Sequence, residues 1–536
     1  MQDRYELAEE VIGQQMCNMY FANDQNRFYA ASTSVGSGKT RASVEYMTCA
    51  EQASRNFIYV APTIKLVEQT TQDLKKSLSE RGLDTRNINL IHSQCVSSEE
   101  TASAAALSAV NDSLPNIGAT IILTTATFLT ILPALRRKDC WHVVLDEAFS
   151  PLTFIEYELG KEDREKGREY FDSLFMVDAD RNDSVLPASG KHSLVQSVAS
   201  GDWRQAGTKY QGMQKLSKHV LNDALNVELA KKHEDKYLFA SWVTPDYFED
   251  FAEVVFLAAL FEQSILHHLW KTMYKVDFKV HAFFEKAIER NVHESQGQVV
   301  SVGHILEQND NASKYNLQRN YITGEKYETR IGMRVIDRAV EIVSAYFLGK
   351  KSLLQINKWT GYHTRQKHTL QGNTTVIPTI SHGLNDYSQY RAIAALAVTN
   401  PSPYQKEWLE KRTGLSENEV YRAFRIHTVY QACGRTAIRD AENSEPVTFI
   451  TVGKDDAWFL HKLFSGSAWL GQVGDMRRLS KSTENLSGNP RYQALRLNYK
   501  RLMTKKSRGG LDDIGNEQLN LIRSEISSLK RDNCSK

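Results

Sequence analysis

The sequence has few of the features that assign a chain to a specialised class of protein. Its six cysteines, at positions 17, 49, 95, 140, 433 and 534, form no Cys-x-x-Cys pair. This spacing argues against a zinc or iron–sulfur site and favours a reducing intracellular setting. The formal net charge of +2 carries no global basic signal. Any nucleic-acid binding would therefore have to come from the local placement of basic residues.

Signals for secretion or membrane insertion are also missing from the pattern. The stretch MQDRYELAEEVIGQQM at the start of the sequence is acidic and polar, whereas a signal peptide is basic and then apolar. The longest apolar stretch begins at Thr120 and is interrupted by Pro133, short of the ~20 residues that a membrane span requires. We therefore expect a soluble intracellular protein, in the cytoplasm or the nucleoid, with no membrane partner.

The sequence does contain a series of short apolar runs separated by segments of helical length. A chain of 536 residues can form two or three domains. The runs predict an α/β fold with two domains, each built on a parallel sheet that is covered on both faces. The first series lies at 27–33, 56–63, 88–93, 119–125, 142–148 and 253–260, and the second at 352–358, 374–380, 392–398 and 447–453.

Two segments depart from this alternation. The last two runs of the first series are more than 100 residues apart, far beyond an ordinary connection. The helical periodicity of residues 216–236 predicts a helical insert at about 151–245, either a packing element or a contact for nucleic acid or a partner. Residues 471–536 hold 14 Lys and Arg against 7 Asp and Glu, which predicts a solvated tail or a phosphate-backbone contact.

A glycine-rich stretch, TSVGSGKT, lies between an apolar run and a helical segment at 33–40. The phosphate-binding loop pattern opens with glycine, and here that position is Thr33. The rest of the pattern is present, so we expect loop N–H groups to bind phosphate, Lys39 to reach the β- and γ-phosphates, and Thr40 to ligate Mg²⁺. The predicted nucleotide-binding residues of this loop are Val35, Gly36, Ser37, Gly38, Lys39 and Thr40.

An acidic pair follows the apolar run WHVVL, as the second half of such a site requires. Asp146 is expected to hold Mg²⁺, directly or through water. Glu147 is expected to orient or deprotonate the attacking water. Together with the loop, the pair predicts an enzyme that hydrolyses ATP with Mg²⁺.

The tetrad DEAF at 146–149 and the loop GSGKT resemble two motifs of the superfamily-two DEAD/DEAH-like helicases. Further stretches resemble that family in the family's order: VAPTIKLVEQ (60–69), LTTATFL (123–129), SHGLNDY (381–387) and QACGRTAIR (431–439). The resemblance spans roughly residues 10–460. It implies two tandem RecA-like P-loop NTPase domains, at 1–270 and 271–463, followed by a basic helical extension at 464–536.

The resemblance also implies roles for individual residues. Arg435 and Arg439 would stabilise transition-state charge as arginine fingers, and Gln431 would lie near the γ-phosphate. Gln15 would contact adenine, with Gln14 as its competitor. Residues matching motifs that grip a nucleic-acid backbone are Thr63, Lys65, Thr124 and Thr125, together with Gly383 and Asn385, which are also assigned to the nucleotide site.

Two departures from the family pattern bear on function. The usual Gly-Arg-x-x-Arg spacing is lengthened between Arg435 and Arg439, which would still share one face of a helix. The hydroxyl-bearing motif that couples hydrolysis to strand separation is matched by Ala258, Ala259 and Leu260, which have no hydroxyl.

The resulting hypothesis is an ATP-dependent DNA helicase or translocase of a replication or repair system, including that of a virus or mobile element, with protein partners at the insert or the extension. DNA is favoured over RNA by analogy with replication and repair motors. The alternatives are an RNA helicase, a nucleic-acid-stimulated remodelling or loading factor without processive unwinding, and a nucleotide-dependent protein-interaction module.

Overall fold

The chain is described by a computed structural model, and its described residues fall into two compact units. The described ranges are 27–83, 87–96, 100–160, 164–201, 212–288, 291–307, 312–321, 333–363, 373–379, 387–476, 490–507 and 513–534. Unit 1 holds the described residues up to Ser295 together with Pro401–Gly434. Unit 2 holds those from Gln296 up to residue 379, Tyr387–Asn400 and those from Arg435 on. The expected boundary at 270/271 therefore differs from this division.

Unit 1 is built on a seven-stranded sheet in which all neighbouring strands are parallel. The order across the sheet is β12-β1-β11-β5-β2-β4-β3, and six of the seven strands coincide with the first series of apolar runs. Their bounds are β1 (Phe28–Thr33), β2 (Asn56–Ala61), β3 (Ile88–Ile91), β4 (Thr120–Thr124), β5 (Trp141–Asp146), β11 (Glu253–Ala259) and β12 (Lys279–Val280).

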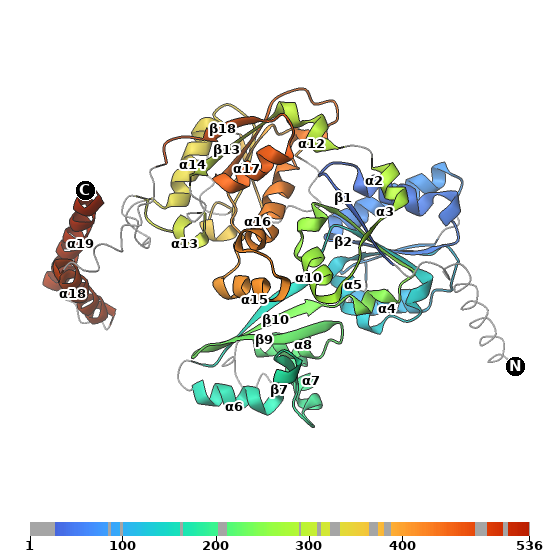
Figure 1. Cartoon of the computed structure of the whole chain (residues 1–536), viewed down its shortest axis with the longest axis horizontal. Helices are drawn as coiled ribbons and strands as arrows, with labels where there is room; N and C mark the ends of the chain where they lie inside the picture. Colours follow the sequence, from blue (N-terminus) through green and yellow to red (C-terminus); the bar gives the residue numbers. More distant parts are fainter. Residues whose placement is uncertain are drawn as a thin grey trace. The chain divides into compact units, whose positions relative to one another are not determined.

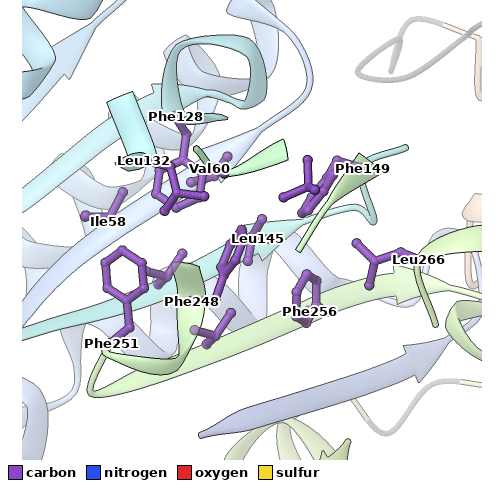
Figure 2. Packing of buried hydrophobic residues seen from close by; sticks show 14 of the residues in the cluster. Ile58, Val60, Phe128, Leu132, Leu145, Phe149, Phe248, Phe251, Phe256 and Leu266 are labelled. Atoms are coloured by element: carbon purple, nitrogen blue, oxygen red, sulfur yellow. The ribbon is translucent and has the colours of Figure 1, made fainter. Parts of the chain in front are cut away.

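Alternate residues of these strands enter two separate cores, because successive side chains of a strand point to opposite faces. One face carries the cluster of Figure 2, where Leu145 and Phe256 lie among Phe248, Phe251 and Phe128. The other face packs against α2 and α3. The helices of unit 1 around this sheet are α2 (Lys39–Thr48), α3 (Ile64–Glu80), α4 (Ala102–Asn111), α5 (Thr125–Ile131), α9 (Asp246–Glu249), α10 (Ile265–Tyr274), α11 (Ala282–Ala287) and α12 (Val292–Ser295).

A largely buried carboxylate, that of Glu253, lies at the start of β11, and its side chain is 12% exposed. Its two oxygens lie 3.1 Å from His142 Nδ1 and 2.9 Å from His281 Nε2, and Tyr46 donates its hydroxyl to the carboxylate at 2.8 Å. Burial alone would raise the pKa of Glu253, but the hydrogen bonds from His142 and His281 outweigh burial and hold that pKa well below its usual range. Glu253 therefore stays ionised inside the unit.

The insert differs from the expected helical subdomain because its core element is a five-stranded antiparallel sheet in the order β6-β10-β9-β8-β7. Residues 216–236, for which a helix was expected, leave α8 after Val220 and form β9 and the start of β10. Both faces of β10 are covered, since Phe239 enters the insert's own core and Trp242 enters the core of Figure 2. The insert comprises β6 (Leu152–Glu158), α6 (Arg164–Leu174), β7 (Phe175–Asp178), β8 (Ser184–Pro187), α7 (His192–Ser200), α8 (Met213–Val220), β9 (Leu225–Lys232) and β10 (Lys236–Val243).

Two helices from much later in the sequence belong to unit 1. They are α15 (Pro403–Thr413) and α16 (Glu417–Cys433). Trp408 of α15 is buried, with its ring 5.8 Å from that of Phe154 and 5.3 Å from that of Trp242. Arg412 pairs with the buried carboxylate of Glu228. The strands of the insert and α15 thus lie side by side, as Figure 1 shows.

Unit 2 is built on a second sheet, again with all neighbouring strands parallel, in the order β15-β14-β16-β17-β13-β18. Two parallel sheets, one in each unit, are what the prediction of two RecA-like domains requires. Four strands match the second series of apolar runs. The bounds are β13 (Val300–Leu306), α13 (Lys314–Leu317), α14 (Val335–Tyr346), β14 (Ser352–Gln355), β15 (Thr374–Ile377), β16 (Ala392–Ala395), β17 (Val447–Gly453), α17 (Lys454–Leu463) and β18 (Ala468–Gln472).

The expected C-terminal extension begins inside unit 2, because β18 pairs with β13 at the edge of the sheet. It ends in two helices, α18 (Pro490–Ser507) and α19 (Asp513–Cys534). These two pack on each other through Tyr492 and Ile526. Within the described ranges, no helix combines the length and the apolar character that crossing a membrane requires.

Candidate functional site

The phosphate-binding loop lies between β1 and α2, at the carboxyl end of the first sheet. Gly36 and Gly38 have φ of 71° and 92°, which only glycine adopts without strain. Gly38 is the N-cap of α2, so the loop leads directly into a helix N-terminus, where N–H groups can bind an anion. Lys39 is buried, and its Nζ lies 3.2 Å from the carbonyl oxygen of Ser34.

The acidic pair lies at the end of β5, two strands from β1 in the sheet. Thr40 donates its hydroxyl to Asp146 Oδ2 at 2.6 Å, and Tyr59 donates to the same oxygen at 2.6 Å. Burial is the main cause that raises the pKa of Asp146, and the charge of Glu147 adds to it, while the two hydrogen bonds oppose the shift. The structure therefore brings together the two residues that were expected to hold Mg²⁺.

Tyr59 was missed by the sequence analysis. It lies in the middle of β2, where all six residues are buried, and its hydroxyl also accepts from Thr70 at 3.3 Å. The only signal in the sequence is a polar hydroxyl within the apolar run NFIYVA. Such a group needs a partner when it is buried, but the sequence does not show that this partner is Asp146.

Glu147 has a strained backbone, with φ of 93°. For a residue with a Cβ this conformation costs about 1–3 kcal/mol, and such residues cluster at functional sites. The Glu147 N–H donates to the carbonyl of Leu257 at 3.0 Å, which fixes the turn against β11. Gln431 of α16 donates its side-chain amide to Glu147 Oε2 at 3.2 Å. The first residue of the last helicase-like motif thus contacts the acidic pair within unit 1.

Two further residues beside the loop had not been predicted. Tyr430, next to Gln431, accepts a hydrogen bond from the N–H of Val35 at 2.8 Å. His293 lies with Nε2 2.6 Å from the same hydroxyl. No local motif marks either residue, since both contacts join segments that are far apart in the sequence.

The residues expected to grip a nucleic-acid backbone follow β2 and β4, which are neighbours in the sheet, with Ala61 opposite Thr124. Thr63 caps α3 by accepting from the N–H of Leu66, and Thr124 caps α5 by accepting from the N–H of Thr127. Thr125 begins α5 and is half-buried, and Lys65 in the first turn of α3 is exposed. All four therefore lie at the carboxyl edge of the sheet, the edge that also carries the phosphate-binding loop.

Other predicted site residues lie elsewhere. Gln15, with its competitor Gln14, and Gly383 and Asn385 lie outside the described residues. Arg435 and Arg439 belong to unit 2. The expectation that they share one helix face was wrong, because α16 ends at Cys433 and Arg439 ends a separate 3₁₀ turn, Ala437–Arg439. Their role as arginine fingers stays a prediction.

The segment that replaces the hydroxyl-bearing coupling motif lies at the end of β11, between β1 and β5. Ala258 and Ala259 are fully buried strand residues, and Leu260 turns the chain with φ of 54°. Ala259 lies opposite Thr33. The segment therefore adjoins the phosphate-binding loop, and its side chains supply packing without a polar group.

Comparisons with known proteins found one family model and several solved structures that are similar to this chain. The family model for DEAD/DEAH box helicases matches residues 12–149. The structure of S. cerevisiae Dbp5 bound to RNA and ADP BeF3 is similar to this chain, with 11% sequence identity and a TM-score of 0.37. The similarity covers 83% of this chain and 85% of the Dbp5 chain. The structure of Mss116p bound to ssRNA and AMP-PNP is also similar, with 10% sequence identity and a TM-score of 0.34. This similarity covers 90% of this chain and 78% of the Mss116p chain. No curated protein matches the sequence. The residues that match the DEAD/DEAH box helicase model include both the phosphate-binding loop and the acidic pair.

Proposed function

We propose that the chain is an ATP-dependent nucleic-acid helicase or translocase. The observation that carries this proposal is the meeting of three motifs in unit 1. Thr40 of the phosphate-binding loop bonds to Asp146, and Gln431 bonds to Glu147. A phosphate site joined to an acidic pair and to a residue from a later motif is what nucleotide hydrolysis requires.

The loop fits the triphosphate of ATP. Gly36 and Gly38 have left-handed backbone conformations, which anion-binding loops use to turn successive N–H groups toward one side. The Ser37 hydroxyl is buried and has no hydrogen-bond partner among the described residues. It is therefore available to a phosphate oxygen. Lys39 would leave Ser34 and bind the β- and γ-phosphates.

Thr40 and Asp146 fit Mg²⁺, which takes hard oxygen ligands. When bound, the ion would neutralise charge on the phosphate oxygens. The Thr40 hydroxyl donates to Asp146, so the two oxygen ligands are adjacent. The carboxylate would remain an acceptor while the hydroxyl turns its lone pair toward the metal.

Glu147 and Gln431 would position the attacking water. Gln431 is 2% exposed, and its Oε1 has no hydrogen-bond partner among the described residues. An unsatisfied buried acceptor is costly, and a water donating to it would remove that cost. The Glu147 carboxylate, one hydrogen bond away, would accept the proton that this water loses.

Nucleic acid would bind along the carboxyl edge of the first sheet. Thr63, Thr124 and Thr125 would contact phosphates through hydroxyl and N–H groups, and Lys65 would add a positive charge. Such contacts do not read base sequence. We favour DNA as the partner, with RNA as the alternative. Closure of the two units on ATP, followed by release on hydrolysis, would move the chain along the strand.

A remodelling or loading factor without processive unwinding is the second candidate. The observation that favours it is the hydroxyl-free end of β11, where Ala258 and Ala259 adjoin the loop. Without polar groups there, hydrolysis would have to be coupled to strand separation by other contacts. A strand-displacement assay separates the two functions, because a remodelling factor would be stimulated by nucleic acid yet displace no strand.

The central experiment is the ATPase rate with single-stranded DNA, duplex DNA, RNA and no nucleic acid. Lys39→Ala and Glu147→Gln should each lower kcat by about 10²-fold or more, since both act on transition-state charge or the attacking water. Lys76→Ala is the matched control, because that lysine side chain is 76% exposed on the far turns of α3. Unchanged turnover in Lys39→Ala would refute the phosphate site. A wild-type ATPase rate that does not change with any of these nucleic acids would refute the proposed helicase or translocase function.

A further inference from the structure

The last turn of α16 contacts the phosphate-binding loop at Val35. The Val35 N–H donates to the Tyr430 hydroxyl at 2.8 Å. Gly434, which caps the same helix, packs against the Val35 side chain so closely that an added Cβ would lie 2.4 Å from Cγ2. The backbone and the side chain of Val35 therefore both fix the end of α16.

The chemistry of Tyr430 suits a buried two-sided contact. Burial raises the pKa of Tyr430 well above its usual range, so the side chain is a neutral hydroxyl that can accept one hydrogen bond and donate another. Val35 supplies the donor. The second partner is His293, whose Nε2 lies 2.6 Å away. Burial, reinforced by the charge of Lys39, lowers the pKa of His293 to about 4. The imidazole is then neutral, and its nitrogen can accept a hydrogen bond from the Tyr430 hydroxyl.

The position of His293 is itself tied to the loop. The N–H of Val292, the preceding residue, donates to the Ser34 hydroxyl at 3.0 Å. The hydroxyl of Tyr430 thus lies between two groups that are both fixed to the phosphate-binding loop. Phenylalanine at 430 would fill the same space but would leave the Val35 N–H and His293 without this partner.

The neighbouring residue explains why the contact bears on chemistry. Gln431 follows Tyr430 directly, and successive residues of a helix point about 100° apart. Tyr430 therefore faces the loop while Gln431 faces the acidic pair, where it bonds to Glu147. A shift of this turn would move both contacts together.

We propose that Tyr430 is a positioning residue for ATP hydrolysis: its hydroxyl, held between the Val35 N–H and His293, fixes the last turn of α16 and so places Gln431 at Glu147. The inference rests on the proposed function, because it assigns Gln431 and Glu147 to the attacking water. Tyr430 itself touches no reacting atom in this scheme. It acts through Gln431.

The test compares Tyr430→Phe with Tyr421→Phe, a change of the same kind on the same helix at a half-buried position whose ring lies 6.0 Å from Lys406 Nζ. For Tyr430→Phe we expect kcat to fall about fivefold, the factor for one ordinary hydrogen bond, while the KM for ATP changes by less than about twofold. Amide exchange at Val35 in the nucleotide-free protein should accelerate by a similar factor, about fivefold. Tyr421→Phe should match the wild type in all three measurements.

A double mutant tests whether the effect passes through Gln431. Gln431→Ala and the pair Tyr430→Phe/Gln431→Ala should have the same kcat, because a positioning residue has nothing left to position. Multiplied losses in the double mutant would overturn the proposal, as would wild-type kcat or unchanged Val35 exchange in Tyr430→Phe. Failure of the proposed function would give a result that can be told apart from these. Wild type and Lys39→Ala would then have the same ATPase rate, whatever the rate of amide exchange at Val35.

Discussion

Gly434→Ala should disable the site without unfolding the protein. Gly434 has φ of −65°, which alanine adopts freely, so the backbone gives no reason for glycine here. The reason is contact, because the added Cβ would lie 2.4 Å from Val35 Cγ2 and 2.6 Å from its Cβ, against 3.4–4 Å for ordinary van der Waals contact. Relief requires the end of α16 to move by roughly 1 Å, and overpacking of this kind costs about 1–3 kcal/mol.

A movement of that size would break the site geometrically. The Gln431 amide lies 3.2 Å from Glu147, already near the limit of a hydrogen bond. Misplacement of a catalytic group by 1 Å can cost about 10²-fold in rate. We therefore expect kcat for ATP to fall about 10- to 100-fold in Gly434→Ala, with a melting temperature lowered by only a few degrees.

The decisive assay is rescue by a second change. Val35→Gly removes all three side-chain atoms that would lie under 3.0 Å from the new Cβ, namely Cβ, Cγ1 and Cγ2 of Val35. The double mutant Val35→Gly/Gly434→Ala should therefore recover most of the rate of Val35→Gly alone. Val35→Gly is the necessary control, because it loosens the loop by itself. If Gly434→Ala keeps the wild-type rate, or if the double mutant is no better than Gly434→Ala, the reasoning from close contact is wrong.

Two further predictions concern stability. The pKa of Glu253 is held below its ordinary value of 4.5, so the ionised carboxylate contributes its full stabilisation above about pH 4.5 and loses it as the pH falls below that value. Glu253→Gln should therefore lower the free energy of unfolding by about 1.5–3 kcal/mol at pH 7. Urea titrations below pH 4.5 should show a smaller difference between the variant and the wild type, whereas a constant difference would contradict the assignment. Arg412→Ala leaves the buried Glu228 unpaired and should cost about 3–5 kcal/mol, measured by urea unfolding. Lys231→Ala, which breaks an exposed pair with Glu407 of α15, should cost less than about 1 kcal/mol. Equal losses in the two variants would refute the role of burial.

Ten of the thirteen strands of the two parallel sheets match predicted apolar runs, most of them because they are buried on both faces, whereas β12, β13 and β18 were missed. The sequence of a strand such as β5 is then a short, almost continuous apolar run. The longer segments that form helices do not have this pattern. The edge strand β18 could not be found this way, since Ala468 and Leu470 are exposed and the run is broken by Gly471. Nor could the insert sheet be predicted, because β9 carries charged residues in a pattern that is also compatible with a helix.

The site divides in the same manner between local and distant contacts. Lys39, Thr40 and Asp146 each belong to a short motif that can be recognised from a few neighbouring residues. The sequence therefore predicts that the three residues form one site. Tyr59 and Tyr430 act through partners on other elements. Only the fold places those hydroxyls, and an isolated tyrosine in a buried segment is ordinarily core packing.

The contacts of α15 bear on the two interpretations of the insert, a packing element or a binding surface. The helices α15 and α16 lie in the chain between β16 and β17, which are neighbouring strands of unit 2, yet both helices pack within unit 1. Trp408 is covered by rings of the insert, and a buried tryptophan of this kind is worth about 3–5 kcal/mol. The last turn of α16, the second helix of this pair, carries Tyr430 and Gln431. The insert therefore supports the helices that carry two residues to the nucleotide site, which favours the packing interpretation.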